Sequence, residues 1–80
     1  MTAAERAERE RSWATRVHQR REEIGMTQVQ LAQLAGVTQQ AVSRVEKGEV
    51  VPRLTTMRAI ASALGTSIEV LFPMTSAPVR

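Results

Sequence analysis

Hydrophobic residues recur along the chain at spacings of three and four, in segments that are separated by glycine and proline. This spacing places side chains on one face of an α-helix. No stretch alternates between polar and apolar residues for long enough to predict a strand; the best candidate, residues 49–51, lies beside a proline and is interpreted as a turn. The pattern therefore predicts an all-α fold with five short helices.

The first predicted helix ends at Gly25 and changes in character along its length. Thr2 and Glu5 have the spacing of a capping box, which favours a helix start at this point. The apolar face that follows consists of three residues, Trp13, Val17 and Ile24. Residues 2–12 are almost entirely charged residues and alanine, so we expect this end of the helix to be solvated or frayed.

The next two predicted helices are short and close together. Each begins at a threonine, Thr27 or Thr38, a residue type that caps helix N-termini, and each ends at a glycine, Gly36 or Gly48. Their inward-facing positions are Leu31, Leu34, Ala35, Ala41, Val42 and Val45. Because Gly36 and Val37 alone join them, the two helices are expected to cross steeply, in a helix-turn-helix arrangement.

Two more helices complete the predicted fold. The fourth, at residues 54–64, has its apolar positions at Leu54, Met57, Ile60, Ala61 and Leu64. The fifth is short, begins near Ser67 and ends before Pro73, and its inward residues are Ile68, Leu71 and Phe72. Residues 73–80 have the composition of a flexible terminus.

The composition narrows the classes of function. The chain has no cysteine, no aspartate and one histidine, His18, so we expect no disulfide, no metal site, no cofactor and no enzymatic activity. No apolar run approaches the roughly 20 residues of a membrane span, and we expect a cytoplasmic protein. The net charge of +3 suits a polyanion partner without requiring one. Trp13 is expected to anchor the core or, at its edge, an interface.

The outer face of the third predicted helix carries side chains that can read bases. With its valines buried, this face presents Gln39, Gln40, Ser43, Arg44 and Lys47. Glutamine can bond adenine through N6 and N7, and arginine can bond guanine through O6 and N7. Such residues reach successive base edges when the N-terminus of a helix enters the major groove. The alternative is a merely solvated helix face.

Residues 16–72 resemble the Cro/C1-type (XRE family) helix-turn-helix domain of lambdoid phage repressors. The resemblance rests on Thr27–Gln28, Leu31–Ala32, Ala35–Gly36–Val37, the run SRVEKG at 43–48, Pro52 and Ala63–Leu64–Gly65. It implies a lambda repressor-like domain with an extended first helix. The chain is then divided into a charged helical extension (1–15), the domain (16–72, with its motif at about 27–47) and a flexible tail (73–80).

The resemblance also implies roles for individual residues. Base-reading positions fall on Gln39, Gln40 and Arg44, and Ser43 is placed to touch a base or a phosphate. Phosphate-contacting positions fall on Gln28 and Arg53, with Thr38 and Lys47 as weaker candidates. Arg21 and Glu46 fall on a pair that forms an internal salt bridge between the first and third helices.

These observations predict a transcriptional regulator that binds double-stranded DNA sequence-specifically, and the resemblance implies a repressor. One recognition helix reads only about four base pairs, so we expect a homodimer on a palindromic operator. The interface candidates are Val50, Val51, Val70, Leu71 and Phe72, or the long first helix. The alternatives are an antitoxin or restriction–modification controller that acts with a protein partner, and a protein-interaction module that does not bind DNA.

Overall fold

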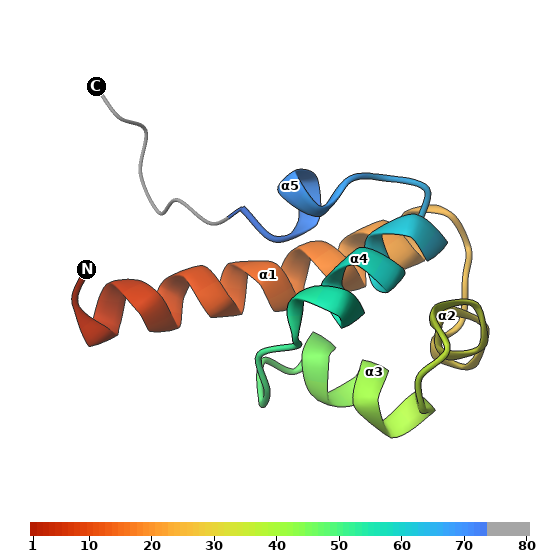
Figure 1. Cartoon of the computed structure of the whole chain (residues 1–80), viewed down its shortest axis with the longest axis horizontal. Helices are drawn as coiled ribbons and strands as arrows, with labels where there is room; N and C mark the ends of the chain where they lie inside the picture. The colour runs from red at the N-terminus through yellow and green to blue at the C-terminus, as the bar shows by residue number, and fades with distance from the viewer. Residues whose placement is uncertain (74–80) are drawn as a thin grey trace.

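The computed structural model describes residues 1–73, and these residues form five helices joined by short loops (Figure 1). The helices are α1 (Ala3–Glu23), α2 (Gln28–Ala35), α3 (Gln39–Glu46), α4 (Leu54–Ala63) and α5 (Ile68–Leu71). Residues 1–73 contain no strand, so the predicted all-α fold with five helices is confirmed. Most of the predicted flexible tail, residues 74–80, lies outside the described residues.

Local sequence signals account for where the helices begin. The Glu5 backbone N–H donates to Thr2 Oγ1 at 3.1 Å, and the Thr2 N–H donates to Glu5 Oε1 at 2.7 Å. Thr27 and Gln30 form the same reciprocal box at the start of α2. These bonds satisfy N–H groups that have no partner inside a helix. The charged end of α1 is therefore a solvated helix from Ala3 onward, rather than a frayed one.

The turn between α2 and α3 follows from Gly36. Its φ is +71°, in the left-handed region that side chains disfavour, and this ends α2. The Thr38 hydroxyl then accepts the Ala41 N–H at 3.0 Å and starts α3. Two helices of eight residues each are thus set against one another by a glycine and a threonine.

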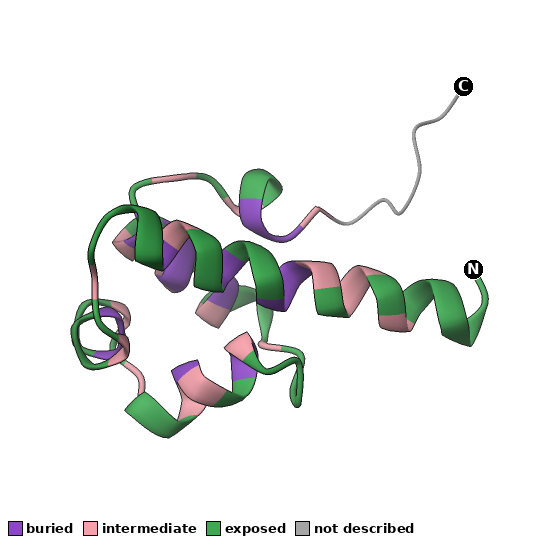
Figure 2. Ribbon diagram, turned by 180° about the vertical axis from the view of Figure 1, so that it is seen from behind, coloured by how far each residue is buried: buried purple, intermediate pink, exposed green. Residues whose placement is uncertain are grey.

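The core lies where α1, α2, α3 and α4 meet, and α5 closes it on the side of α1 away from α3 (Figures 1 and 2). Phe72 is 1% exposed and meets Trp13 edge-on, with ring centroids 5.9 Å apart. The Trp13 Nε1–H donates to the Pro73 carbonyl at 2.9 Å, and the Arg9 guanidinium lies 5.3 Å above the indole ring. Trp13, 5% exposed, is therefore a core residue and not an interface residue.

Some apolar residues differ from prediction. Three that were predicted to face inward are exposed, namely Ile24 (41%), Leu34 (64%) and Leu54 (50%). Ile24 and Leu54 lie at helix ends, and Leu34 lies about 200° around the helix from buried Ala32. Leu71 and Phe72 are buried in the chain's own core, which confirms their predicted inward positions, and their alternative role as interface residues was wrong.

Candidate nucleic-acid interface

α3 lies at the surface of the fold, with one face packed and one face exposed (Figures 1 and 2). Val42 and Val45 are buried against α1 and α2. Gln39, Gln40 and Arg44 are exposed on the other side. Within the described residues, the side chains of these three make no hydrogen bond or ion pair. Their polar groups are therefore available to a ligand.

The start of α2 and the first turns of α3 enclose a shallow groove of about 260 Å³. Its lining consists of Gln28, Gln39, Gln40 and Ser43. The structure thus brings together one residue at a predicted phosphate-contacting position and three at predicted base-contacting positions. Amide and hydroxyl groups of this kind can both donate and accept hydrogen bonds. We call this the amide groove.

The other candidate residues surround α3. Arg44 is exposed on the helix but does not line the amide groove. Lys47 is exposed at the C-terminal cap of α3, and Arg53 is exposed at the N-terminal cap of α4, where its side chain makes no capping bond. The Thr38 hydroxyl oxygen is used to cap α3. Within residues 1–73, the side chains of Lys47 and Arg53 therefore make no hydrogen bond or ion pair, whereas the Thr38 hydroxyl has a structural role.

Glu46 lies on the inner side of α3 and ties three helices together. Its side chain is 4% exposed, and Arg21 of α1 donates to it through Nε at 2.7 Å and through Nη2 at 3.0 Å. His18 Nδ1 lies 3.0 Å from Glu46 Oε1, and Gln28 Nε2 donates to the same oxygen at 3.2 Å. The Arg21–Glu46 ion pair implied by the resemblance is therefore present.

The surroundings of the Glu46 carboxyl group favour its ionised form. Burial raises the pKa of Glu46, but the hydrogen bonds from Arg21, His18 and Gln28 outweigh burial and hold this pKa below its usual value. The hydrogen bond to Glu46 raises the pKa of Arg21. Arg21 also donates through Nη1 to the Met26 carbonyl at 2.8 Å, which fixes the loop before α2.

Two members of this cluster had no such role in the sequence interpretation. His18 was given no partner, yet it contacts Glu46, and its Nε2 lies 3.7 Å from Glu22. Gln28 was expected at a phosphate, yet one of its N–H groups is bound inside the protein. The available signal was the spacing of His18 and Arg21, which are three residues apart and so share a helix face.

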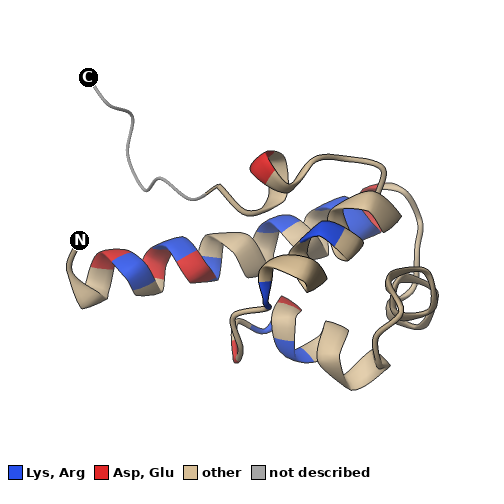
Figure 3. Ribbon diagram, viewed as in Figure 1, with Lys and Arg blue, Asp and Glu red and all other residues tan. Residues whose placement is uncertain are grey.

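The helix-turn-helix itself carries little charge. α2 has no charged residue, and α3 has only Arg44 and Glu46 (Figure 3). Most of the charged residues lie on α1. Residues 1–73 contain no group of three His, Cys, Asp or Glu side chains that could hold a metal ion. The same residues contain no helix that is long and apolar enough to cross a membrane.

Comparison with known proteins points to one segment of the chain. The helix-turn-helix family model matches residues 17–71. An HTH-type transcriptional regulator of Methanothermobacter thermautotrophicus is 43% identical over 51 residues, which are 64% of this chain and 74% of the relative. The family match therefore falls on the helical domain rather than on the charged start of α1.

Solved structures share the same arrangement of helices. The restriction-modification controller protein C.AhdI from Aeromonas hydrophila superimposes with a TM-score of 0.75 and 29% identity, over 78% of this chain and 94% of that chain. Hydroxypropylphosphonic acid epoxidase from S. wedmorenis superimposes with a TM-score of 0.72 and 38% identity, over 80% of this chain. The match covers 34% of the epoxidase, so this chain spans about a third of that enzyme.

Proposed function

The chain belongs to the helix-turn-helix family of DNA-binding transcriptional regulators, and from this premise we propose that it is a homodimeric repressor of a palindromic operator. The dimer occupies an operator that overlaps a promoter and so excludes the polymerase sterically. The repressor acts in the cytoplasm, associated with the nucleoid through its DNA. It needs no cofactor and catalyses no reaction.

The proposal for base recognition rests on the residues of the amide groove and on Arg44. Gln39 and Gln40 are exposed in the first turn of α3, where the N-terminal end of a recognition helix meets base edges. In this proposal the two glutamines bond adenine, and Arg44, further along the same face, bonds guanine. Ser43, which lines the groove, contacts a base or the adjoining phosphate.

Contacts with the DNA backbone position the helix. Gln28 lines the amide groove at the start of α2, and the N–H of its side chain that Glu46 does not use is the proposed phosphate donor. Arg53 and Lys47 are exposed on the two sides of the α3–α4 loop and supply positive charge. Thr38 is the weakest candidate, because its hydroxyl also caps α3. Such contacts set affinity and register but not sequence preference.

Dimerisation supplies the length of the recognition site. One helix reads about four base pairs, whereas two helices related by a two-fold axis read half-sites about 10 base pairs apart. Val50 and Val51 in the α3–α4 loop and Val70 on α5 are exposed, at 43%, 50% and 53%. The proposed interface uses these valines, and the charged face of α1 is the competing surface.

Selection of bound sequences from a random duplex pool tests this proposal. The wild-type chain is expected to enrich a two-fold symmetric motif with half-sites about 10 base pairs apart. Gln40→Ala is expected to relax the preference at one position of each half-site. Gln33→Ala is the matched control, because Gln33 is an exposed glutamine of α2 outside the amide groove. Binding only at low salt, without any enriched motif, would reject sequence-specific recognition and favour a protein-interaction module.

A restriction–modification controller, which acts with a neighbouring gene product, is the second candidate. The superposition on C.AhdI over 94% of that chain favours it over an antitoxin. Footprinting on the DNA around the chain's own gene distinguishes the two candidates. A controller protects a site that governs an adjacent endonuclease gene, whereas a simple repressor does not. Enhanced operator binding in the presence of an adjacent toxin would instead support the antitoxin.

A further inference from the structure

His18 of α1 contacts the inner side of α3, and the proposed function gives it no part. It is the only histidine of the chain. Its side chain is 47% exposed, so water reaches the ring, yet its Nδ1 lies 3.0 Å from Oε1 of the nearly buried Glu46. The same oxygen accepts an N–H from Gln28 Nε2 at 3.2 Å. One carboxylate oxygen therefore lies between a side chain that titrates and a side chain of the amide groove.

The surroundings of the His18 ring indicate which nitrogen carries the hydrogen when the ring is neutral. Nδ1 lies near Glu46 and also 3.2 Å from Arg21 Nη2, and one nitrogen cannot donate to the first and accept from the second. Arg21 Nη2 already donates to Glu46 at 3.0 Å, and a hydrogen bond to a carboxylate is charge-assisted. We therefore assign the hydrogen to Nδ1, which donates to Glu46. Nε2 is then the nitrogen that takes up a proton, and it lies 3.7 Å from Glu22 Oε1.

The charge of the imidazole decides the charge balance around Glu46. Within residues 1–73, the charged side chains that contact the ring are Glu46 from α3 and Arg21 and Glu22 from α1. α2, which supplies Gln28, has no charged residue. With a neutral ring, two carboxylates face one guanidinium. With a protonated ring, each ring nitrogen faces a carboxylate, and Glu46 is shared by two cations.

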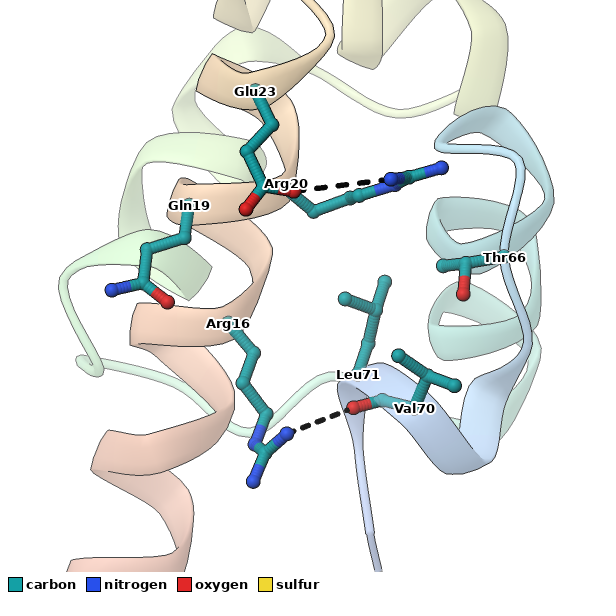
Figure 4. Close-up of a pocket in the computed structure, with 7 residues that line it drawn as sticks. All are labelled: Arg16, Gln19, Arg20, Glu23, Thr66, Val70 and Leu71. Carbon is teal, nitrogen blue, oxygen red and sulfur yellow. Dashed lines mark hydrogen bonds and ion pairs between the residues drawn. The ribbon is translucent and has the colours of Figure 1, made fainter.

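The other charged residues of this part of α1 lie on its opposite side (Figure 4). Arg16, Arg20 and Glu23 line a groove that faces α5, together with Gln19. Arg20 Nη1 lies 3.8 Å from Glu23 Oε1 in this groove. At about 100° per residue, the three charged residues lie roughly 140–200° around the helix from His18. They do not contact the imidazole, so its charge acts on the cluster around Glu46.

We propose that His18 is a positioning residue for the contact between Gln28 and the DNA backbone, and that it acts through Glu46. This inference rests on the proposed function, in which Gln28 donates to a phosphate. The Gln28 bond, at 3.2 Å, is the longest of the four contacts to Glu46, so it weakens first when a second cation shares the carboxylate.

Protonation of His18 has two consequences for the phosphate, and both have the same sign. The Gln28 amide is held less tightly by Glu46 and is free to turn toward the phosphate. The negative charge of Glu46, which repels the phosphate, is offset by the imidazolium. DNA binding therefore strengthens as the pH falls through the range in which histidine side chains titrate, from about pH 8 to pH 5.

Fluorescence anisotropy of the full chain on its selected operator, across this pH range at constant ionic strength, tests the proposal. The expected result is binding about three- to tenfold tighter at the low end, the contribution of one hydrogen bond. His18→Gln keeps a donor for Glu46 but does not titrate, so it should lose this response. Gln28→Ala should lose it as well, although its affinity is lower throughout. A full response in either variant would overturn the proposal.

A matched control keeps the imidazole but moves it along the helix. The double variant His18→Gln/Gln19→His transfers the ring to the next position, which is exposed and lies about 100° around α1, away from Glu46. Its number of titrating groups equals that of the wild type, so a general effect of charge on DNA binding would persist in it. We expect no pH response in this variant, and a response equal to that of the wild type would reject the role of the site. Circular dichroism at each pH confirms that the variants are folded.

A measurement without DNA separates this inference from the proposed function. Nuclear magnetic resonance of the free chain follows the side-chain NH₂ signals of Gln28 while the His18 ring titrates. These signals should shift with the same midpoint as the ring signals, whereas those of Gln33, an exposed glutamine outside the amide groove, should not. Gln28 signals that do not follow the titration would overturn the link through Glu46. Coupled signals in a chain that selects no operator would reject the proposed function and support the link from His18 to Gln28.

Discussion

α3 turns one face to the interior and one to solvent, and the two faces differ in how their polar side chains are held. On the inner face, Glu46 accepts four contacts from three residues, at distances between 2.7 and 3.2 Å. On the outer face, Gln39, Gln40 and Arg44 have no partner among the described residues. The same helix therefore separates a structural polar cluster from a set of side chains that are free to bind.

The contrast has an energetic reason. A carboxylate that is almost fully buried is tolerated only when it is paired and hydrogen-bonded, and Glu46 is bound by Arg21, His18 and Gln28. An exposed glutamine or arginine is solvated by water and exchanges those bonds for bonds with a ligand. Gln28 joins the two faces, because it binds Glu46 with one N–H and lines the amide groove with the rest of its amide.

Removal of the Glu46 carboxylate is expected to have the largest effect. Glu46→Ala leaves the nearly buried Arg21 without its counter-charge and should lower the free energy of unfolding by about 3–5 kcal/mol. Urea denaturation followed by circular dichroism measures this. Glu49→Ala, which removes an exposed glutamate three residues later, should change it by less than about 0.5 kcal/mol. Similar losses in the two variants would show that the inner face has no special role.

The pH dependence of the free energy of unfolding should show the contribution of the same cluster around Glu46. Glu46 has a lower pKa in the folded chain than its ordinary value of 4.5, so its contribution is complete above about pH 4.5. This contribution is lost as the pH falls from there through the folded pKa, because the carboxylate takes up a proton. The difference in unfolding free energy between the wild type and Glu46→Gln should therefore shrink below pH 4.5. A constant difference between pH 7 and pH 3 would contradict this interpretation.

The outer face should show the reverse behaviour. Arg44→Ala is expected to weaken binding to the selected operator by about 1–3 kcal/mol and to relax the preference at one base position. Because Arg44 is exposed and has no partner within residues 1–73, the free energy of unfolding of Arg44→Ala should differ from the wild type by less than about 0.5 kcal/mol. Fluorescence anisotropy on operator and random duplexes measures the first effect. Equal losses on both duplexes would make Arg44 a phosphate contact.

Those elements of the fold that depend on local chemistry were predictable from the sequence. The capping threonines Thr2, Thr27 and Thr38 begin three helices at the expected residues, and Gly36 forms the left-handed turn of the motif. These signals act over four or five residues, so they do not depend on the rest of the fold. The polarity of the outer face of α3 followed equally directly, from the spacing of its valines.

Features that depend on neighbouring helices were not predictable in this way. Periodicity placed Leu34 and Leu54 on apolar faces, but it does not indicate which part of a face a neighbouring helix covers, and both side chains are exposed. Phe72 was predicted both to face inward and to be an interface candidate, and its partner, Trp13, lies 59 residues away in the sequence, beyond any local pattern. The contacts of His18 and Gln28 with Glu46 likewise join residues 28 and 18 positions apart.

The smallest expected effect concerns Arg53, at the edge of the outer face. This residue is exposed at the start of α4, and its side chain makes no capping bond and no other hydrogen bond or ion pair within residues 1–73. Arg53→Ala should weaken operator and random DNA alike and reduce the slope of log affinity against log salt by about one unit, the contribution of one neutralised phosphate. Arg58→Ala, an exposed arginine in the middle of α4, is the matched control for the loss of charge. If both variants reduced the slope equally, the effect would come from net charge. An unchanged slope in Arg53→Ala would place the residue outside the interface and confine DNA contacts to the motif itself.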